Sequence, residues 1–266
     1  MNDDRLAFAR DLAQHVGAFA LECFLAGPKD VASKAPGDLV TEVDREVERR
    51  CRDAIGSAYP RDAVLGEEFG GRLLENTWVI DPIDGTQNFT LGVPFWCISI
   101  GFLIDGAPVL GVVHDPLHQE TFWALEGRGA FCNAAAITPS DRTAFSGATI
   151  GFGLAAHRDA GSTLALLAQL STAQASVRGQ GAGALSLCHV ACGRLDGFFE
   201  ERIHLWDVAA ALVLLREAGG KARFAIDADA PQRAAPVHAL APGLGRSVRS
   251  VLDRATLEAF GIDPAP

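Results

Sequence analysis

Four short apolar runs follow one another in the middle of the chain, and they constrain the fold more than any other feature. They are rich in β-branched and aromatic side chains, and turn residues such as Asp105-Gly106 separate them. They occupy residues 78–81, 95–104, 107–115 and 120–126. Runs of this length and composition, broken by such turns, are typical of neighbouring antiparallel strands.

Helical periodicity precedes these runs. Apolar residues recur three and four positions apart from Leu6 to Phe24, which predicts an amphipathic helix that ends at Gly27-Pro28. A second one-sided pattern predicts a helix that begins near Thr41 and ends before Pro60.

After about residue 145 the pattern alternates between strand and helix. Strands are expected over 147–153, 175–179 and 195–201, and helices over 163–170, 185–192, 207–218 and 246–260. No repeat or linker divides the chain. These patterns predict an α+β fold over residues 1–266, with sub-halves of about 1–145 and 146–266 that share one interface.

The charge balance argues against two classes of partner. The formal net charge is -10, no basic run occurs, and no stretch of about 18 uncharged apolar residues is present. We therefore expect no nucleic-acid ligand and no membrane. The first ten residues do not read as a secretory signal, and the six cysteines are scattered, so we expect a cytoplasmic protein with free thiols.

Acidic residues gather directly after the first apolar run. Asp81 follows Trp78-Val79-Ile80, and Pro82 is expected to end that strand so that Asp84 turns back towards Asp81. The Ile83 carbonyl would lie between them. Two close carboxylates repel unless a cation separates them, and donors that are all oxygen favour Mg²⁺ over Mn²⁺ or Ca²⁺. The alternative is a simple aspartate-rich turn.

Other residues extend the same pattern. Gly85-Thr86 offers backbone N–H groups to a phosphate, and Glu67 and Glu68 follow another short apolar strand. Asp207 opens an apolar helix. Taken alone, Asp207 is also typical of a helix N-cap and the two glutamates of a solvated loop.

Four segments together resemble one family. They are "LVTEVD" (39–44), "GEE" (66–68), "DPIDGTQNF" (81–89) and "WDVAAALVLLREAGG" (206–220). In this order and spacing they resemble the inositol monophosphatase family of Mg²⁺-dependent, lithium-sensitive phosphatases, over about residues 5–225. The resemblance implies a five-layer αβαβα sandwich, a homodimer, and hydrolysis of small phosphate monoesters such as inositol or other polyol phosphates.

The resemblance also implies a role for individual residues. It implies that two or three Mg²⁺ ions are bound by Glu67, Asp81, the Ile83 carbonyl, Asp84 and Asp207. Glu67 and Thr86 would hold the attacking water, with Asp44 behind Thr86. The substrate-binding groups would be Gly85, Thr86, Gly181, Ala182, Gly183, Glu200 and Asp207, with the phosphate on Gly85 and Thr86.

The substrate end departs from the family pattern. Ala182 stands where relatives usually have Ser or Thr, so one hydroxyl contact to the leaving alcohol is lost. Residues 154–161 also differ from the sequence that is usual for the family. Two alternatives stay open: a histidinol-phosphate phosphatase with the same metal site, and a regulatory binder without turnover. Retention of every ligand acid and of Thr86 favours an enzyme over the binder.

Overall fold

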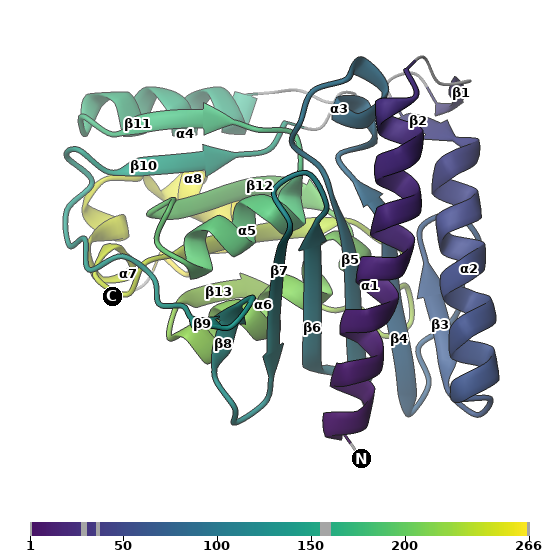
Figure 1. The fold of residues 1–266 in the computed structure, drawn as a ribbon. Coiled ribbons are helices and arrows are strands. Elements are labelled where there is room, and N and C mark those ends of the chain that lie inside the picture. The colour runs from purple at the N-terminus through teal and green to yellow at the C-terminus, as the bar shows by residue number, and fades with distance from the viewer. Residues whose placement is uncertain (1, 28–30, 36–37, 155–160, 265–266) are drawn as a thin grey trace.

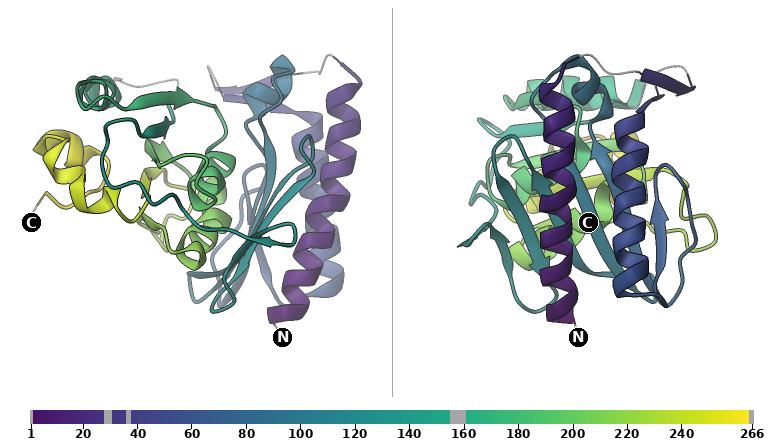
Figure 2. Two further views of the ribbon diagram at one scale, coloured as in Figure 1. Left: turned by 60° about the vertical axis from the view of Figure 1, so that its left-hand side comes forward. Right: turned by 45° about the vertical axis from the view of Figure 1, so that its right-hand side comes forward.

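Two large sheets alternate with three helical layers. The computed structural model describes residues 2–27, 31–35, 38–154 and 161–264, with the backbone alone over 31–35 and 38–41. Figure 2 shows the layers edge-on: helices from the N-terminal part of the chain lie outside the first sheet, others lie between the sheets, and further helices, including those at the C-terminus, lie outside the second sheet. This is the five-layer αβαβα arrangement expected above.

The first sheet contains the four central runs. Its order is β3-β4-β5-β6-β7-β8-β9, and every neighbouring pair is antiparallel except β3 and β4. The strands are β3 (Ala63–Gly66), β4 (Asn76–Asp84), β5 (Cys97–Ile104), β6 (Ala107–Asp115), β7 (Glu120–Leu125), β8 (Ala130–Cys132) and β9 (Ala135–Ala136). The predicted antiparallel neighbours are therefore confirmed.

Two long helices cover the outer face of this sheet (Figure 1). They are α1 (Asn2–Leu25) and α2 (Glu42–Ala58), close to the predicted bounds. Their apolar stripes bury Val16, Val47 and Ile55 completely against β4, β5 and β6. A short hairpin, β1 (Val31–Ala35) with β2 (Asp38–Thr41), and the helix α3 (Thr86–Leu91) lie at one end.

The second sheet has the order β11-β10-β12-β14-β13. Its strands are β10 (Thr149–Phe152), β11 (Ser176–Gly179), β12 (Gly197–Ile203), β13 (Lys221–Phe224) and β14 (Ala235–Leu240). The middle helices are α5 (Gly183–Ala191) and α6 (Leu205–Ala218), and the outer elements are α4 (Gly161–Thr172), α7 (Leu244–Ser247), the 3₁₀ turn η1 (Val248–Ser250) and α8 (Arg254–Ala259). Ten residues of α6 are buried, because the helix has a sheet on each side.

Three sequence expectations were wrong in detail. The single helix expected over 246–260 is broken, because the Asp253 carboxylate caps a new helix by accepting the Thr256 N–H at 2.8 Å. The strand at Asp81 does not end at Pro82 but continues to Asp84. Strands β13 and β14 were not anticipated, since β13 is short and alternates exposed basic with half-buried apolar residues.

One core cluster joins both halves. It combines Val79 and Val113 of the first sheet with Phe198 and Val237 of the second, through the buried faces of α5 and α6. The six cysteines are free thiols, as expected. Within the described ranges, no helix has both the length and the apolar character needed to cross a membrane.

Candidate active site

A β-bulge turns Asp81 and Asp84 to the same side of the first sheet. Side chains of a regular strand alternate, so residues three apart would face opposite sides. Here Asp81 pairs with Ser99 and Asp84 with Cys97, so three steps on β4 match two steps on β5. The extra residue restores a common direction, and Pro82 is tolerated because a bulge needs no regular ladder hydrogen bond there.

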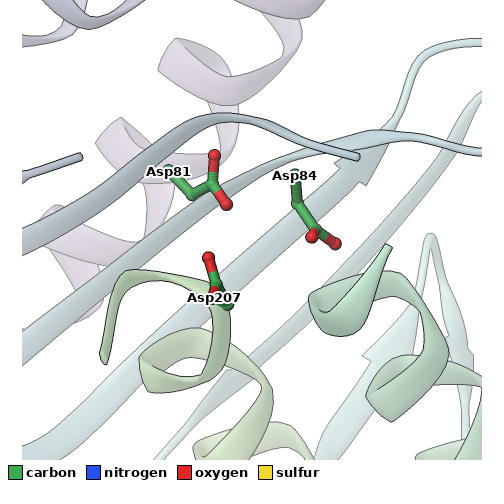
Figure 3. A group of neighbouring side chains, drawn as sticks. All are labelled: Asp81, Asp84 and Asp207. Atoms are coloured by element: carbon green, nitrogen blue, oxygen red, sulfur yellow. The ribbon is translucent and has the colours of Figure 1, made fainter. Parts of the chain in front are cut away.

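Asp207 reaches these carboxylates from α6, the helix that lies between the two sheets. His204 is the N-cap, and its N–H donates to the Asp207 carboxylate at 2.9 Å, so Asp207 is the third residue of the helix rather than its cap. Ligand atoms of Asp81, Asp84 and Asp207 all lie within 4.8 Å of one another. Figure 3 shows the three side chains pointing into the same space.

This concentration of buried acid is unfavourable by itself. Burial raises the pKa of Asp81, and the charges of Glu67, Asp207 and Asp84 raise it further. Burial, with the charge of Asp207, raises the pKa of Asp84 to about 7. Burial also raises the pKa of Asp207, although a hydrogen bond from the Asp81 carboxyl opposes that rise. A hard divalent cation would relieve the repulsion, so the donor set fits such an ion.

Asp84 also receives two backbone N–H groups from the first turn of α5. Gly183 N donates to one carboxylate oxygen at 2.9 Å and Leu185 N to the other at 3.3 Å. Both bonds favour the ionised form and lower its pKa. A carboxylate at a helix N-terminus is a known stabilising arrangement, but no sequence pattern linked residue 84 to residue 183.

Thr86 and Asp44 form a second group beside the carboxylates. The Thr86 hydroxyl lies 3.1 Å from the Asp44 carboxylate and 3.1 Å from the Ile83 carbonyl oxygen. Asp44 is completely buried on α2. The sequence expectation that Asp44 lies behind Thr86 agrees with this contact.

Gly85 fits its position because no side chain can. Its φ is +93°, and a Cβ there would lie 3.1 Å from both the Ala182 Cβ and the Phe95 carbonyl oxygen. Asn88 strengthens the same junction, since its amide donates to the carbonyl oxygens of Phe95 and Gln180 at 2.7 Å each. The turn that contains Gly85 is therefore held against the segment that contains Gly181.

Glu67 is held near the acids by a residue that the sequence did not reveal. Glu48 on α2 is completely buried, and its carboxylate accepts the Glu68 N–H at 2.6 Å and the Phe69 N–H at 3.3 Å. Arg52 Nε donates to the same carboxylate at 2.7 Å. Glu48 lies in a charge-rich helical stretch, so its sequence context suggested only a solvated face.

One cavity collects nearly all the expected residues. Its lining comprises Glu67, Asp81, Ile83, Asp84, Gly85, Thr86, Gln87, Phe152, Gly153, Leu154, Gly181, Ala182, Gly183, Phe198, Glu200, Ile203 and Asp207. Asp44 is the exception, because it lies behind Thr86. Of the atypical segment 154–161, residues 155–160 lie outside the described residues.

Glu200 lines this cavity, and so do the apolar residues Phe152, Phe198 and Ile203. Burial raises the pKa of Glu200 well above the ordinary value, and the charges of Asp207 and Asp84 raise it further. Its carboxylate occupies the space beside Gly153, where a Cβ would lie 2.0 Å from a Glu200 oxygen. Glu200 is thus close enough to Asp207 and Asp84 for their charges to act on it.

The fold and the acidic cavity together define a class of α+β proteins with a carboxylate site suited to divalent cations. Comparison with known proteins narrows that class. The family model described as the inositol monophosphatase family matches residues 1–234. The chain belongs to that family.

Individual relatives carry two kinds of name. An inositol-1-monophosphatase of Rhizobium meliloti is 36% identical over 231 residues, covering 84% of this chain and 86% of that protein. The Nus factor SuhB of Xylella fastidiosa is 39% identical over 211 residues, covering 76% and 74%. Among solved structures, a Thermotoga maritima IMPase aligns with a TM-score of 0.86 at 31% identity, covering 97% of this chain and 100% of that one.

Proposed function

We propose that this protein is a Mg²⁺-dependent phosphatase that hydrolyses a small phosphate monoester, with inositol monophosphate or a similar polyol phosphate as substrate. The observation that carries the proposal is the convergence of Asp81, Asp84 and Asp207 from β4 and α6 on one cavity. Such a costly group of buried acids is hard to explain as a structural feature.

Five oxygen donors would hold two or three Mg²⁺ ions. They come from Glu67, Asp81, the Ile83 carbonyl, Asp84 and Asp207. When bound, Mg²⁺ lowers the pKa of a water molecule and neutralises charge on the phosphate and the leaving oxygen. The hydrogen bonds from the Gly183 and Leu185 N–H groups would fix the orientation of the Asp84 carboxylate as a metal ligand.

Thr86 and Asp44 would activate the attacking water. The single Thr86 hydroxyl proton can be donated to only one oxygen at a time. When the Thr86 hydroxyl donates its hydrogen bond to Asp44, its lone pair is free to accept a hydrogen bond from the attacking water, and the Glu67 carboxylate would accept a hydrogen bond from the other hydrogen of that water. One of these two acceptors would take the single proton that the water loses as it attacks. The N–H groups of Gly85 and Thr86 would receive the phosphate.

Replacing Thr86 by valine tests this role. The change keeps the shape of the side chain and removes the hydroxyl, so we expect kcat to fall by about 10²–10⁴-fold while the melting temperature and Mg²⁺ affinity stay close to wild type. Steady-state phosphate release and thermal melts measure these quantities. An unchanged kcat would exclude Thr86 from water activation.

The leaving alcohol would contact Glu200 and the cavity wall beside Ala182. Gly181 and Gly183 shape this wall. The Gly183 N–H is already donated to Asp84 and is not available to the substrate. Since Ala182 offers no hydroxyl, we expect tolerance of alcohols other than inositol, and histidinol phosphate is the second candidate.

Phosphate release from a panel that includes inositol 1-phosphate and histidinol phosphate, with and without Mg²⁺, tests the proposal. Asp84→Asn should abolish release and keep the fold. Asp105→Asn is the matched control, because Asp105 is exposed at a β-turn with φ of +50°, which asparagine also tolerates. Wild type that releases no phosphate from any panel member at several Mg²⁺ concentrations would overturn the phosphatase proposal.

The SuhB names of several relatives favour one other candidate, a regulatory binder that uses the same fold. Absence of phosphate release from every substrate of the panel would support this candidate. A homodimer and a cytoplasmic location stay predictions; analytical ultracentrifugation tests the first.

A further inference from the structure

The strand β13 forms an open edge of the second sheet. It pairs with β14 on one side, from Lys221 opposite Leu240 to Phe224 opposite Val237. Within the described ranges, no strand pairs with its other side. In an antiparallel ladder, alternate residues direct their N–H and C=O groups away from the partner strand, so β13 offers unpaired backbone groups along this edge.

A groove lined by residues of β13 and α6 (Figure 1 shows the strand beside the helix) borders this edge. Its apolar lining includes Leu212 of α6 with Phe224 and Ile226, and its basic lining includes Arg216, Lys221 and Arg223. The strand therefore presents both backbone hydrogen-bonding groups and alternating side chains. An added strand uses these two features, the first for affinity and the second for specificity.

The charge of this groove is opposite to that of the whole molecule. Lys221 and Arg223 are exposed and form no ion pair with any residue that the structure describes, in a chain of net charge -10. Arg216 is only loosely paired, at 3.6 Å from a Glu126 oxygen and 3.8 Å from a Glu217 oxygen, and it donates to the Pro108 carbonyl oxygen at 3.0 Å. The edge is thus a small cationic area that favours a negatively charged occupant.

Two other occupants fit less well. A second copy of the chain paired edge to edge would place Lys221 and Arg223 of both copies against each other, and like charges across a ladder are destabilising. A nucleic acid needs a longer basic track than three side chains on a molecule of this net charge.

We propose that the β13 edge binds an extended acidic peptide segment of a partner protein by strand addition. Acidic side chains of the segment lie over Lys221 and Arg223. Apolar side chains on the opposite face contact Ala222, Phe224 and Leu212. The backbone of the segment completes the ladder on the open side of β13.

The test measures fluorescence anisotropy of a short labelled peptide of alternating glutamate and valine residues. We expect saturable binding at low salt that weakens as salt is added, and none by the matching lysine–valine peptide. Arg223→Glu should weaken binding by about tenfold, because it turns an attraction into a repulsion. Arg178→Glu is the matched control, since Arg178 is an exposed residue of β11, the strand at the opposite edge of the same sheet.

Two further peptides separate strand addition from general charge attraction. Each carries N-methyl groups on alternate residues, in one register or the other, so that one of them loses the hydrogen bonds to β13 while keeping its charge. We expect one of the two to bind at least about tenfold more weakly than the unmethylated peptide.

Three results would overturn the proposal. These are equal weakening by Arg178→Glu and Arg223→Glu, no effect of either methylated register, and no binding of the acidic peptide by protein whose circular dichroism spectrum is native. Binding of an oligouridylate that Arg223→Glu removes, without peptide binding, would assign the groove to nucleic acid instead.

Discussion

At the scale of single residues, the molecule tolerates an arrangement that raises its free energy. Asp81, Asp84 and Asp207 each have a raised pKa, and in each case burial is the first cause. Charged groups at this depth are costly unless they are paired with opposite charge. The buried acids therefore lower the stability of the cation-free protein, and the proposed Mg²⁺ would offset that cost.

Asp81→Asn should make the cation-free protein more stable. The Asp81 carboxyl already donates a hydrogen bond to Asp207, and an asparagine NH₂ can donate the same bond without a proton to bind. We expect the melting temperature in EDTA at pH 8 to rise by about 2–4 °C, which corresponds to about 1 kcal/mol. Added Mg²⁺ should raise the melting temperature of wild type above its value in EDTA, and it should not raise that of the variant. A lower melting temperature in EDTA would contradict this account.

The stability effect of the site should depend on pH in a defined direction. An aspartate whose folded pKa is raised from about 3.9 binds its proton more tightly in the native state, so stability falls as pH rises through the folded pKa. For Asp84 that pKa is about 7. Mg²⁺ competes with these protons, so the Mg²⁺-induced increase in melting temperature should be small near pH 5 and large above about pH 7.5. A series of melts with Mg²⁺ or EDTA measures it; a constant increment would contradict it.

Residue types near the site were predictable where they follow strands and turns, as with Asp81, Asp84 and Thr86. The approach of Asp84 to Asp81 was predicted, but its cause was not, because it depends on a one-residue bulge within the strand and on amides of Gly183 and Leu185 from a distant segment. Glu48 was missed for a similar reason, since its partners are backbone N–H groups some twenty residues further along the chain.

At the scale of elements, α6 depends on a flat surface of the first sheet. Gly101 of β5 and Gly111 of β6 lie opposite each other in the ladder, and both face α6. A Cβ on Gly111 would lie 2.1 Å from the Ala210 carbonyl oxygen. The absence of two side chains therefore sets the distance between the sheet and the helix that carries Asp207.

Gly111→Ala should displace α6 and with it Asp207. We expect a loss of about 1–3 kcal/mol in the free energy of unfolding, together with weaker Mg²⁺ binding. Gly101→Ala is the matched control and should cost less, because its Cβ would lie 3.0 Å from the Ala209 Cβ and 3.2 Å from the nearest backbone atom, Ala210 N, a much milder overlap than the 2.1 Å at Gly111. Urea unfolding and Mg²⁺ titration of both variants measure this. Equal effects in the two variants would contradict it.

Long elements with a clear period were predicted well, and short ones were not. The helices α1 and α2 and the strands β4–β7 bury continuous apolar faces, and such faces are visible in the sequence. The strand β13 gains its conformation from pairing with β14, and the break before α8 from a single cap at Asp253. The first is a tertiary effect and the second a local one, and neither is visible in the periodicity of apolar residues.

At the scale of the whole molecule, the two sub-halves share their largest core cluster. Because α5 and α6 contact both sheets, neither half can bury the apolar residues of this shared cluster alone. We expect one cooperative unfolding transition over the chain, with coincident curves from tryptophan fluorescence and far-ultraviolet circular dichroism. Two separate transitions would show that the halves are independent domains.

The carboxylates of the site are far apart along the chain, and this has a consequence for protein synthesis. Glu67, Asp81 and Asp84 are translated early, whereas the α5 amides and Asp207 emerge only after most of the polypeptide has been made. Until then Asp84 lacks its two backbone donors and its acidic neighbour. On the proposed function, a nascent chain on the ribosome would therefore have no finished cation site, and an ion would bind only after α5 and α6 dock between the sheets.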